Sequence, residues 1–429
     1  MNWRSVALGL GVVLAVSGAC SSSDTKLKAR DSGAGEGGNA DAGSAGGDVV
    51  SGAAGGPEAG AGGMPAEPAE GGAAGRSGSA AGGQLAGGDG GRPALGQAGG
   101  GEGGAAQLAP SITTPADVST TLATAFNIAV EATGSGPLLF SLESGVLPAG
   151  IALDSSTGEL SGSTKPEALV SGVLPGQYDV VVRVTNGVGF ADTATFSITV
   201  TGVSLPTPLA YFTYDTADVN AAVLKDASGN NHPGAISGGV TTAATGAVGQ
   251  AFTLDGASGL VSAAGVPTPS GPVSLVATVK PSGAGLGSRI PVQYGISDPA
   301  PTFRGNWIQT ESDGHIYGIF EDGGDRSAGS TTILSINSFT PLGTTWDDVS
   351  KVGRLYVGGL QEGTVTTAGP LLYATTNLET GRHPQFAARF WQGSIDEVAM
   401  WNVLLSPEQM ATVAWLSKTG QSMKTWIGL

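Results

Sequence analysis

A glycine-rich stretch without any aromatic residue is the feature that most restricts what this chain can fold into. Residues 21–107 contain 29 of the 73 glycines, and no Phe, Trp or Tyr occurs between Trp3 and Phe126. Such a stretch has too little apolar surface to offset the entropy that is lost on ordering it. We therefore predict that residues 20–107 form a disordered tether, whose r.m.s. reach is roughly 50 Å for a glycine-rich coil.

Charge and cysteine content exclude several classes of protein. The 429-residue chain carries a formal net charge of −16, from 19 Lys and Arg against 35 Asp and Glu. Nucleic acids and anionic membrane surfaces both require a basic face, so neither is expected as a partner. The single cysteine excludes a disulfide framework. The three histidines lie far apart in the sequence, which disfavours a histidine-based metal site.

The N-terminus reads as a targeting segment. Arg4 precedes an apolar run over residues 6–16 that is too short to span a bilayer. Residues 1–19 followed by Cys20 resemble a bacterial lipoprotein signal, in which small residues precede a cysteine that becomes acylated. The resemblance implies a lipid anchor on Cys20 and a place in the cell envelope, at the outer membrane or cell surface. The alternative is an ordinary secretory signal with a chance cysteine.

The sequence pattern of the remainder of the chain is typical of β-strands. Apolar residues alternate with polar ones at Tyr178, Val180 and Val182, and again at Phe196, Ile198 and Val200. Alternation with period two, interrupted by frequent turn residues, predicts antiparallel sandwiches, so the fold class is all-β. Prolines at 206 and 208 mark a linker between a first domain at residues 108–202 and a second at residues 205–429.

One helix is predicted near the C-terminus. Ser406 and Gln409 form a capping box around Pro407, and Gly420 supplies a stop. The pattern predicts a helix over residues 407–419. Its core-facing residues are Met410, Val413 and Ala414.

The first domain carries a resemblance of its own. The run Leu147–Asp154, followed by Thr157–Gly162, resembles the immunoglobulin-like, cadherin-related repeats of bacterial surface proteins. This resemblance implies an Ig-like β-sandwich that acts as a spacer or an adhesive module. Asp154 either binds calcium, as related repeats do, or caps a turn through its own side chain.

The second domain contains four characteristic segments, Ala210–Asp215, Gly246–Gly256, Arg354–Gly359 and Phe390–Asn402. Together they resemble the laminin-G-like jelly roll of the concanavalin A-like lectin/glucanase superfamily. The family usually has an aspartate where this chain has Gly358. The resemblance implies a jelly-roll sandwich and a role in binding.

No catalytic pattern accompanies that fold. Glycosidases need two carboxylates that flank the sugar, and the E-x-D-x-x-E or E-x-D-x-E strand of the superfamily is missing. Residues 311–315 and 321–325 are acidic, but both contain turn signals such as Asp313-Gly314. The serine-hydrolase elbow G-x-S-x-G is also missing. We expect no enzyme. A glycan-active enzyme and a purely structural envelope protein are the alternatives.

A structural calcium ion is expected in the jelly roll. Alternation along residues 395–401 places Asp396 on the apolar face with Val398 and Met400. A buried carboxylate must be paired or must coordinate a metal. The family resemblance implies calcium on Asp396 together with oxygens near Asp215. The alternative is an ion pair of Asp396 with Arg382 or Arg389.

Ligand binding is expected at aromatic residues, because the apolar face of a sugar ring stacks on aromatic rings. The aromatic candidates are Trp307, Tyr317 and Trp391, and Asn306 beside Trp307 is the candidate for binding sugar hydroxyls. The expected partner is a glycan or a surface protein. Membrane contact is expected only through the lipid anchor.

Overall fold

The computed structural model describes residues 105–167, 175–283, 287–296, 304–384, 386 and 388–428. Cys20, the signal segment and the tether up to residue 104 lie outside these ranges. Within them, no helix has the length and the apolar character needed to cross a bilayer.

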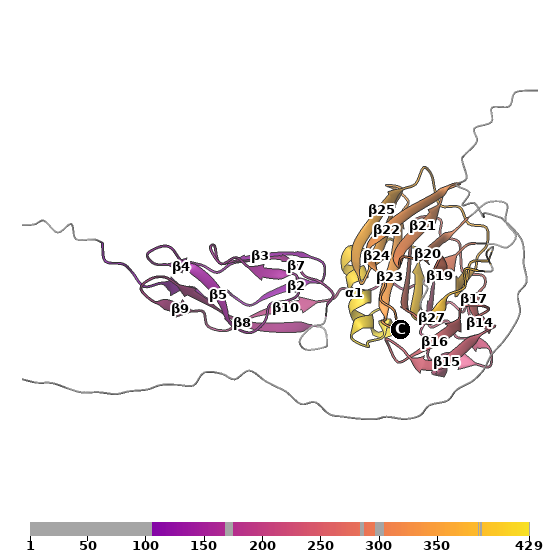
Figure 1. The fold of residues 1–429 in the computed structure, drawn as a ribbon, viewed down its shortest axis with the longest axis horizontal. Helices are drawn as coiled ribbons and strands as arrows, with labels where there is room; N and C mark the ends of the chain where they lie inside the picture. The colour runs from indigo at the N-terminus through magenta and orange to yellow at the C-terminus, as the bar shows by residue number, and fades with distance from the viewer. Residues whose placement is uncertain are drawn as a thin grey trace, which may run out of the picture. The chain divides into compact units, whose positions relative to one another are not determined.

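The first folded part is a small β-sandwich (Figure 1). Its main sheet has the order β2-β10-β8-β5 with β9 beside β8, and β3-β7-β6 form a second sheet. Along β8, the side chains of Tyr178, Val180 and Val182 are buried and alternate with more exposed ones, as predicted. Its strands are β1 (Ser111–Ile112), β2 (Val118–Thr121), β3 (Ala125–Ala129), β4 (Ala132–Thr133), β5 (Leu139–Ser144), β6 (Ile151–Leu153), β7 (Glu159–Ser163), β8 (Gly176–Thr185), β9 (Phe190–Asp192) and β10 (Phe196–Thr201).

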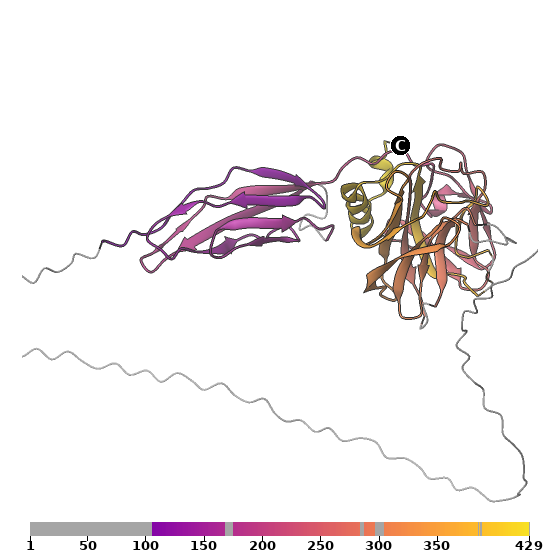
Figure 2. The same cartoon turned by 90° about the horizontal axis from the view of Figure 1, so that it is seen from above.

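The second folded part is a jelly roll of two large sheets, stacked as two layers (Figures 1 and 2). Its elements are β11 (Ala210–Phe212), η1 (Thr216–Asp218), β12 (Val219–Asn220), β13 (Val223–Leu224), β14 (Gly234–Ser237), β15 (Val240–Thr245), β16 (Gln250–Asp255), β17 (Leu260–Ala263), β18 (Val273–Pro281), β19 (Arg289–Tyr294), β20 (Asn306–Thr310), β21 (His315–Glu321), β22 (Asp325–Ile333), β23 (Thr340–Asp347), β24 (Val352–Val357), β25 (Leu360–Thr366), β26 (Leu378–Thr380), β27 (Gln392–Trp401), α1 (Pro407–Lys418) and η2 (Met423–Thr425).

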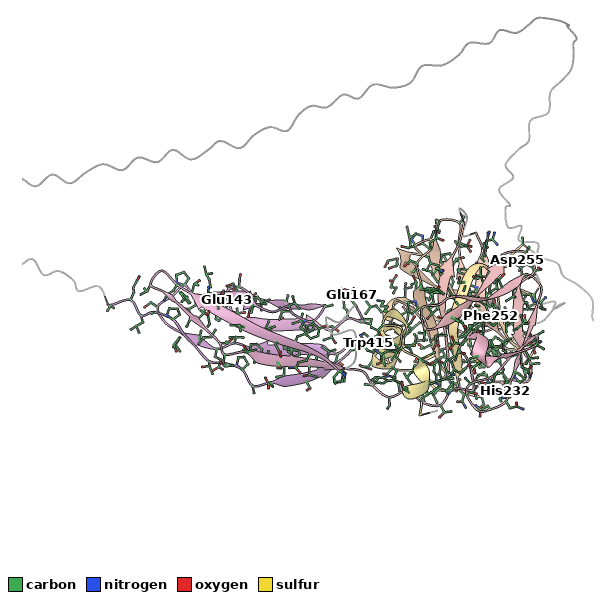
Figure 3. All side chains as sticks on the ribbon, turned by 90° about the horizontal axis from the view of Figure 1, so that it is seen from below. Glu143, Glu167, His232, Phe252, Asp255 and Trp415 are labelled. Carbon is green, nitrogen blue, oxygen red and sulfur yellow. The ribbon has the colours of Figure 1, made fainter. Side chains whose placement is uncertain are left out.

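The strand order of each sheet decides which residues meet. One sheet has eight strands in the order β15-β16-β27-β18-β23-β24-β25, with β11 beside β27. The other has nine, in the order β12-β13-β14-β17-β26-β19-β20-β21-β22. Side chains from both sheets fill the space between them, among them Phe252, Ile308 and Ile395, each fully buried. Figure 3 shows Phe252 inside the jelly roll, whereas His232 lies at its margin.

The predicted helix is confirmed as α1. The Ser406 hydroxyl accepts a hydrogen bond from the Gln409 backbone N–H, and the Gln409 side chain accepts one from the Ser406 N–H, which completes the capping box. At the other end, Gly420 has φ +71°, and Gln421 N–H donates to the Leu416 carbonyl, so the helix ends in a Schellman motif. Helix α1 packs on β23 and β25, and Trp415 on this helix is fully buried (Figure 3).

A bulge in β27 changes which side chains face the core. The register between β18 and β27 shifts between the pairs Val276↔Ala399 and Thr278↔Asp396, and Glu397 adopts φ +47°. An extra residue in one strand moves the following side chains to the other face. Asp396 therefore shares the outer face with Thr278, whose hydroxyl contacts Ser417 on α1 at 3.0 Å.

Candidate functional site

The outer face of the nine-stranded sheet carries a row of polar and aromatic side chains. Ile308 on β20 points into the core, so its neighbours Trp307 and Gln309 point outward. The register pairs Trp307 with Gln293 on β19, and Gln309 with Tyr317 on β21. Three consecutive strands thus place their outward side chains next to one another in a single row.

Glu379 organises one end of this row. Its carboxylate accepts hydrogen bonds from the Ser262 hydroxyl and the Gln293 amide, both at 2.9 Å. Arg382 lies 3.4 Å from the same carboxylate and forms an ion pair with it. Glu379 is buried and fully engaged, so it acts as a structural anchor for the row.

Trp307 lies in the middle of the row and is covered by His383. His383 packs edge-on against its indole ring, with 5.5 Å between the ring centroids and an interplanar angle of 83°. Burial, followed by the charge of Arg389, lowers the pKa of His383 to about 4, so its imidazole is neutral at pH 7. The Trp307 indole N–H donates to Gln309 Oε1 at 3.3 Å.

Gln309 connects the covered Trp307 with the partly exposed Arg389. Its Oε1 also accepts a hydrogen bond from Arg389 Nη1 at 3.2 Å, and its Nε2 donates to Glu311 Oε1. The other oxygen of Glu311 accepts from the Ser288 hydroxyl at 2.7 Å. The Arg389 guanidinium lies over the Phe386 ring, 4.2 Å from its centroid, which holds the cation in one orientation.

Tyr317 is an aromatic residue of this face that stays partly exposed. It stands opposite Gly329 on β22. A Cβ atom at Gly329 would lie 3.0 Å from Tyr317 Cε1, so the glycine leaves room for the ring against the strand. Tyr317, Gln309, Phe386 and Arg389 together form what we call the Tyr317 face.

The structure corrects three of the four expected ligand contacts. Trp391 is fully buried between the sheets, and its indole N–H donates to the Ser394 carbonyl at 3.3 Å. Asn306 is also fully buried, and its side-chain oxygen accepts a hydrogen bond from the Thr344 hydroxyl at 3.2 Å. Trp307 is 2% exposed beneath His383. None of these three offers an open surface to a ligand, because each is already packed by the fold.

Both acidic segments form the turns that were predicted. Glu311–His315 closes the hairpin between β20 and β21, where Gly314 has φ +85° and the Asp313 carboxylate accepts from the His315 N–H. Residues 322–324 close the hairpin between β21 and β22. Glu321 at its base is 1% exposed, which the sequence pattern does not indicate.

Asp154 in the first sandwich caps a turn. Its Oδ1 accepts hydrogen bonds from the backbone N–H groups of Ser156 and Thr157 and from the Ser156 hydroxyl, at 2.7–2.9 Å. These hydrogen bonds, with those from Ser156 the largest cause, lower the pKa of Asp154 to about 2. The turn interpretation is therefore supported by the contacts that this carboxylate makes.

A second candidate site lies around Asp396, at the outer face of β27. Asp396 is fully buried, and its Oδ2 accepts a hydrogen bond from the Val248 N–H at 2.9 Å. Its Oδ1 is buried without a hydrogen-bond partner. Nearby, the Asp215 carboxylate accepts from the Gln250 N–H at 2.8 Å. The turn over residues 246–249 thus brings both carboxylates to the same stretch of backbone.

The face that Asp396 occupies differs from the one expected. Val398 and Met400 belong to the core between the sheets, whereas Asp396 lies on the opposite face because of the bulge at Glu397. The ion-pair alternative also fails. Among the described residues, Asp396 forms no ion pair, and the guanidinium of Arg382 is occupied by Glu379.

Glu397 adds a second buried acid beside Asp396. The Tyr211 hydroxyl donates to Glu397 Oε2 at 2.6 Å, whereas Oε1 is buried without a partner. Burial raises the pKa values of both acids, to about 7 for Asp396 and about 8 for Glu397, and their mutual repulsion adds to the rise for Glu397. In the described part of the chain, no three acidic, histidine or cysteine side chains converge as metal ligands. A cation here would need backbone carbonyls and water as well.

These features define the chain as a β-sandwich protein with an Ig-like domain followed by a jelly roll that carries a polar and aromatic outer face. Residues 255–411 match the model of the family described as the concanavalin A-like lectin/glucanases superfamily. Residues 109–201 match the model of the family described as "Putative Ig domain". No curated protein sequence matches the chain.

Three solved structures are similar to parts of this chain. Domain 4 of an extracellular GH43 arabinanase from Geobacillus stearothermophilus, in complex with arabinotriose, is 20% identical, covers 48% of this chain and 98% of its own, and has a TM-score of 0.37. A Trypanosoma rangeli sialidase is 11% identical, with 57% of this chain and 44% of the sialidase covered and a TM-score of 0.41. A heptameric pentraxin from Limulus polyphemus is 16% identical, with 33% and 69% covered and a TM-score of 0.29. The chain thus spans less than half of the sialidase.

Proposed function

We propose that the chain is a lipid-anchored cell-surface protein whose jelly roll binds carbohydrate at the Tyr317 face without catalysing a reaction. The observation that carries this proposal is the group formed by Tyr317, Gln309 and Arg389. The partly exposed Tyr317 ring offers a surface for the apolar face of a sugar ring. The Arg389 guanidinium, which the Gln309 amide orients, supplies directed hydrogen bonds for hydroxyl groups. A few placed polar groups next to apolar surface are typical of ligand sites.

The acids around this face support a non-catalytic role. Hydrolysis of a glycosidic bond requires two carboxyl groups, roughly 5–10 Å apart, with the sugar between them. Glu379 is held by Ser262, Gln293 and Arg382, and Glu311 is held by Gln309 and Ser288. Both carboxylates are occupied by neighbours from the protein, so neither is placed to attack or protonate a substrate.

The proposal includes a structural calcium ion at Asp396. The orphaned Oδ1 of Asp396 and the nearby Asp215 carboxylate are hard oxygen ligands that suit calcium. A bound cation would neutralise the two buried acids Asp396 and Glu397. It would also tie β27 to the turn at residues 246–249, so its role would be to stabilise the jelly roll.

The proposal also includes the lipid anchor on Cys20 and a place at the cell surface. Its support is the signal-like segment at residues 1–19 and the glycine-rich stretch that follows it. Radiolabelled palmitate incorporation into the wild-type chain, compared with Cys20→Ser, tests the anchor. Label in both proteins would contradict acylation at this cysteine.

A glycan array tests the binding function. The probe is the chain from residue 20 onward, carrying Cys20→Ser so that it is not acylated, in buffer with calcium. We expect reproducible sugar binding, and Tyr317→Ala should lower the affinity by about tenfold, which corresponds to about 1.4 kcal/mol. Tyr317→Phe keeps the ring and should bind nearly as well as the wild type.

Two controls make the array decisive. Phe190→Ala removes an aromatic side chain that is 61% exposed on the Ig-like domain, and it should leave binding unchanged. Gly329→Val places a side chain against the Tyr317 ring and should weaken binding as Tyr317→Ala does. A silent array, or full binding by Tyr317→Ala, would contradict the proposal and favour a surface-protein partner or a structural role.

A further inference from the structure

Arg389 is a cation that the fold orients but does not neutralise. Among the residues that the structure describes, no carboxylate lies within ion-pair distance of Arg389. Arg183 and Arg382 differ from Arg389 in this respect, because Arg183 pairs with Asp192 at 2.7 Å and Arg382 pairs with Glu379. Arg289 also lacks an ion pair, but its Nη1 donates to the Phe390 carbonyl at 2.5 Å. The hydrogen bond that Arg389 makes to Gln309 is directed at a neutral amide oxygen.

Gln309 lies between Arg389 and Glu311, the acid next to the Tyr317 face. The amide accepts from Arg389 at its oxygen and donates to Glu311 at its nitrogen. Glu311 uses its second oxygen for the Ser288 hydroxyl. The carboxylate is thus satisfied by neutral donors, and the positive charge of Arg389 remains available to a ligand.

The guanidinium is also held in place before any ligand arrives. One of its faces lies on the Phe386 ring, and one N–H is bound by Gln309. Arginine presents five donors in a planar fork that matches a carboxylate, and a fork that is already oriented loses less entropy on binding. Arg389 is partly exposed, so its remaining donors can be reached from solvent.

We propose that the Tyr317 face selects glycans that carry a carboxylate, and that Arg389 is the residue that recognises it. This inference rests on the proposed carbohydrate-binding function. Gln309 connects Tyr317 with Arg389, because it stands opposite Tyr317 on the neighbouring strand and accepts a hydrogen bond from Arg389. A sugar ring on Tyr317 therefore has its substituents close to the guanidinium.

Long-range electrostatics cannot supply this preference. The chain has a net charge of −16, which repels anionic ligands at a distance. The selectivity must come from the direct contact with Arg389, where a charge-assisted, two-point hydrogen bond is stronger than a bond to a neutral hydroxyl. A preference for acidic sugars in so acidic a protein would therefore indicate a direct contact between Arg389 and the sugar carboxylate.

The test compares matched ligands by calorimetry on the chain from residue 20 onward with Cys20→Ser. The probes are an oligosaccharide of uronic acids, the same oligosaccharide with its carboxylates reduced to alcohols, and a sulfated oligosaccharide. We expect about tenfold tighter binding of the uronic acid form than of the reduced form. Arg389→Gln should weaken binding of the uronic acid form far more than binding of the reduced form, so that the ratio falls to about one, and Arg389→Lys should keep only part of the ratio.

The outcomes separate the two proposals. Equal binding of the acidic and reduced forms would overturn the carboxylate preference and leave carbohydrate binding intact. Tighter binding of the sulfated form would also overturn it, because the site would then prefer a different anion. Binding of none of the probes, together with a silent glycan array, would overturn the carbohydrate function itself. Arg354→Gln, on the other sheet, is the control and should change nothing, and thermal melting should show that all variants are folded.

Discussion

Asp396 and Val398 lie two residues apart on β27 and point to opposite faces of the eight-stranded sheet. The bulge at Glu397 causes this difference, because it adds one residue to β27 opposite β18. Val398 thereby joins the core, and Asp396 turns toward Val248 and Asp215. Asp396, with its unpartnered Oδ1, is thus buried close to the backbone of Val248 and to the Asp215 carboxylate. The first prediction is based on this arrangement.

The first prediction concerns calcium. A calcium concentration of about 100 times Kd adds about 2.7 kcal/mol to the free energy of unfolding. The wild-type chain should therefore melt about 5–10 °C higher in millimolar calcium than in chelator. Asp396→Asn should remove this response. Asp348→Asn, at an aspartate that pairs only with Lys351, should keep it. Identical melting of the wild type in calcium and in chelator, measured by scanning calorimetry, would exclude the structural ion.

The second prediction concerns pH and Glu321. Burial first, and then the hydrogen bond with Asp325 and its charge, raise the pKa of Glu321 to about 9. The folded state therefore keeps a proton that the unfolded chain releases near its ordinary pKa of about 4.3. The free energy of unfolding should fall as the pH rises from about 5 to about 9, because the unfolded state then binds fewer protons than the folded one.

Glu321→Gln tests this assignment, since glutamine imitates the protonated acid at every pH. Urea denaturation at pH 5, 7 and 9 should show a flatter pH dependence for the variant, and the variant should be the more stable protein at pH 9. Glu143→Gln, at an exposed glutamate of the Ig-like domain, serves as the control. The same slope in the wild type and in Glu321→Gln would show that the proton is held elsewhere.

The third prediction separates core from ligand surface. Trp391→Ala should lower the free energy of unfolding by about 3–5 kcal/mol, because it empties a fully buried site between the sheets. Tyr317→Ala should cost clearly less, because its side chain is only partly buried. Guanidinium denaturation measures both. A stable Trp391→Ala protein that has lost sugar binding would restore Trp391 as a ligand contact.

The fourth prediction concerns the helix start. Ser406→Ala removes the hydroxyl that accepts from the Gln409 N–H, and it should cost about 1 kcal/mol of stability. Gln409→Ala removes the reciprocal bond to the Ser406 N–H and should cost a similar or smaller amount. Chemical denaturation checks both values. No loss in either variant would mean that tertiary packing alone holds α1 in place.

Local chemistry explains the features that could be predicted from sequence. The turn at Asp313-Gly314 forms because glycine adopts a positive φ and the aspartate binds the backbone next to it. The capping box at Ser406 and Gln409 is similarly complete within four residues. Such elements involve neighbours in the chain, so the residues that specify them can be read together.

Contacts between distant segments explain what the sequence pattern missed. Asn306 and Trp307 are adjacent on one strand, so alternation alone permits only one of them to face outward. Trp307 takes that position, yet His383, from a segment far along the chain, covers it. The sequence pattern did not indicate Gln309 as part of this face, and its hydrogen bond to Arg389 joins two segments that are far apart in the chain.

From its sequence alone, this protein is determined to be all-β after a long glycine-rich stretch, with one capped helix and two tight acidic hairpins, because period-two patterning, capping and turn chemistry act between near neighbours. The tertiary structure alone decides that Asp396 lies on the outer face of its sheet and that Trp391 is a core residue. It also decides that Tyr317, Gln309 and Arg389 lie next to one another. Strand order, a bulge and loop cover set those positions, and they depend on pairings between segments that no local pattern encodes.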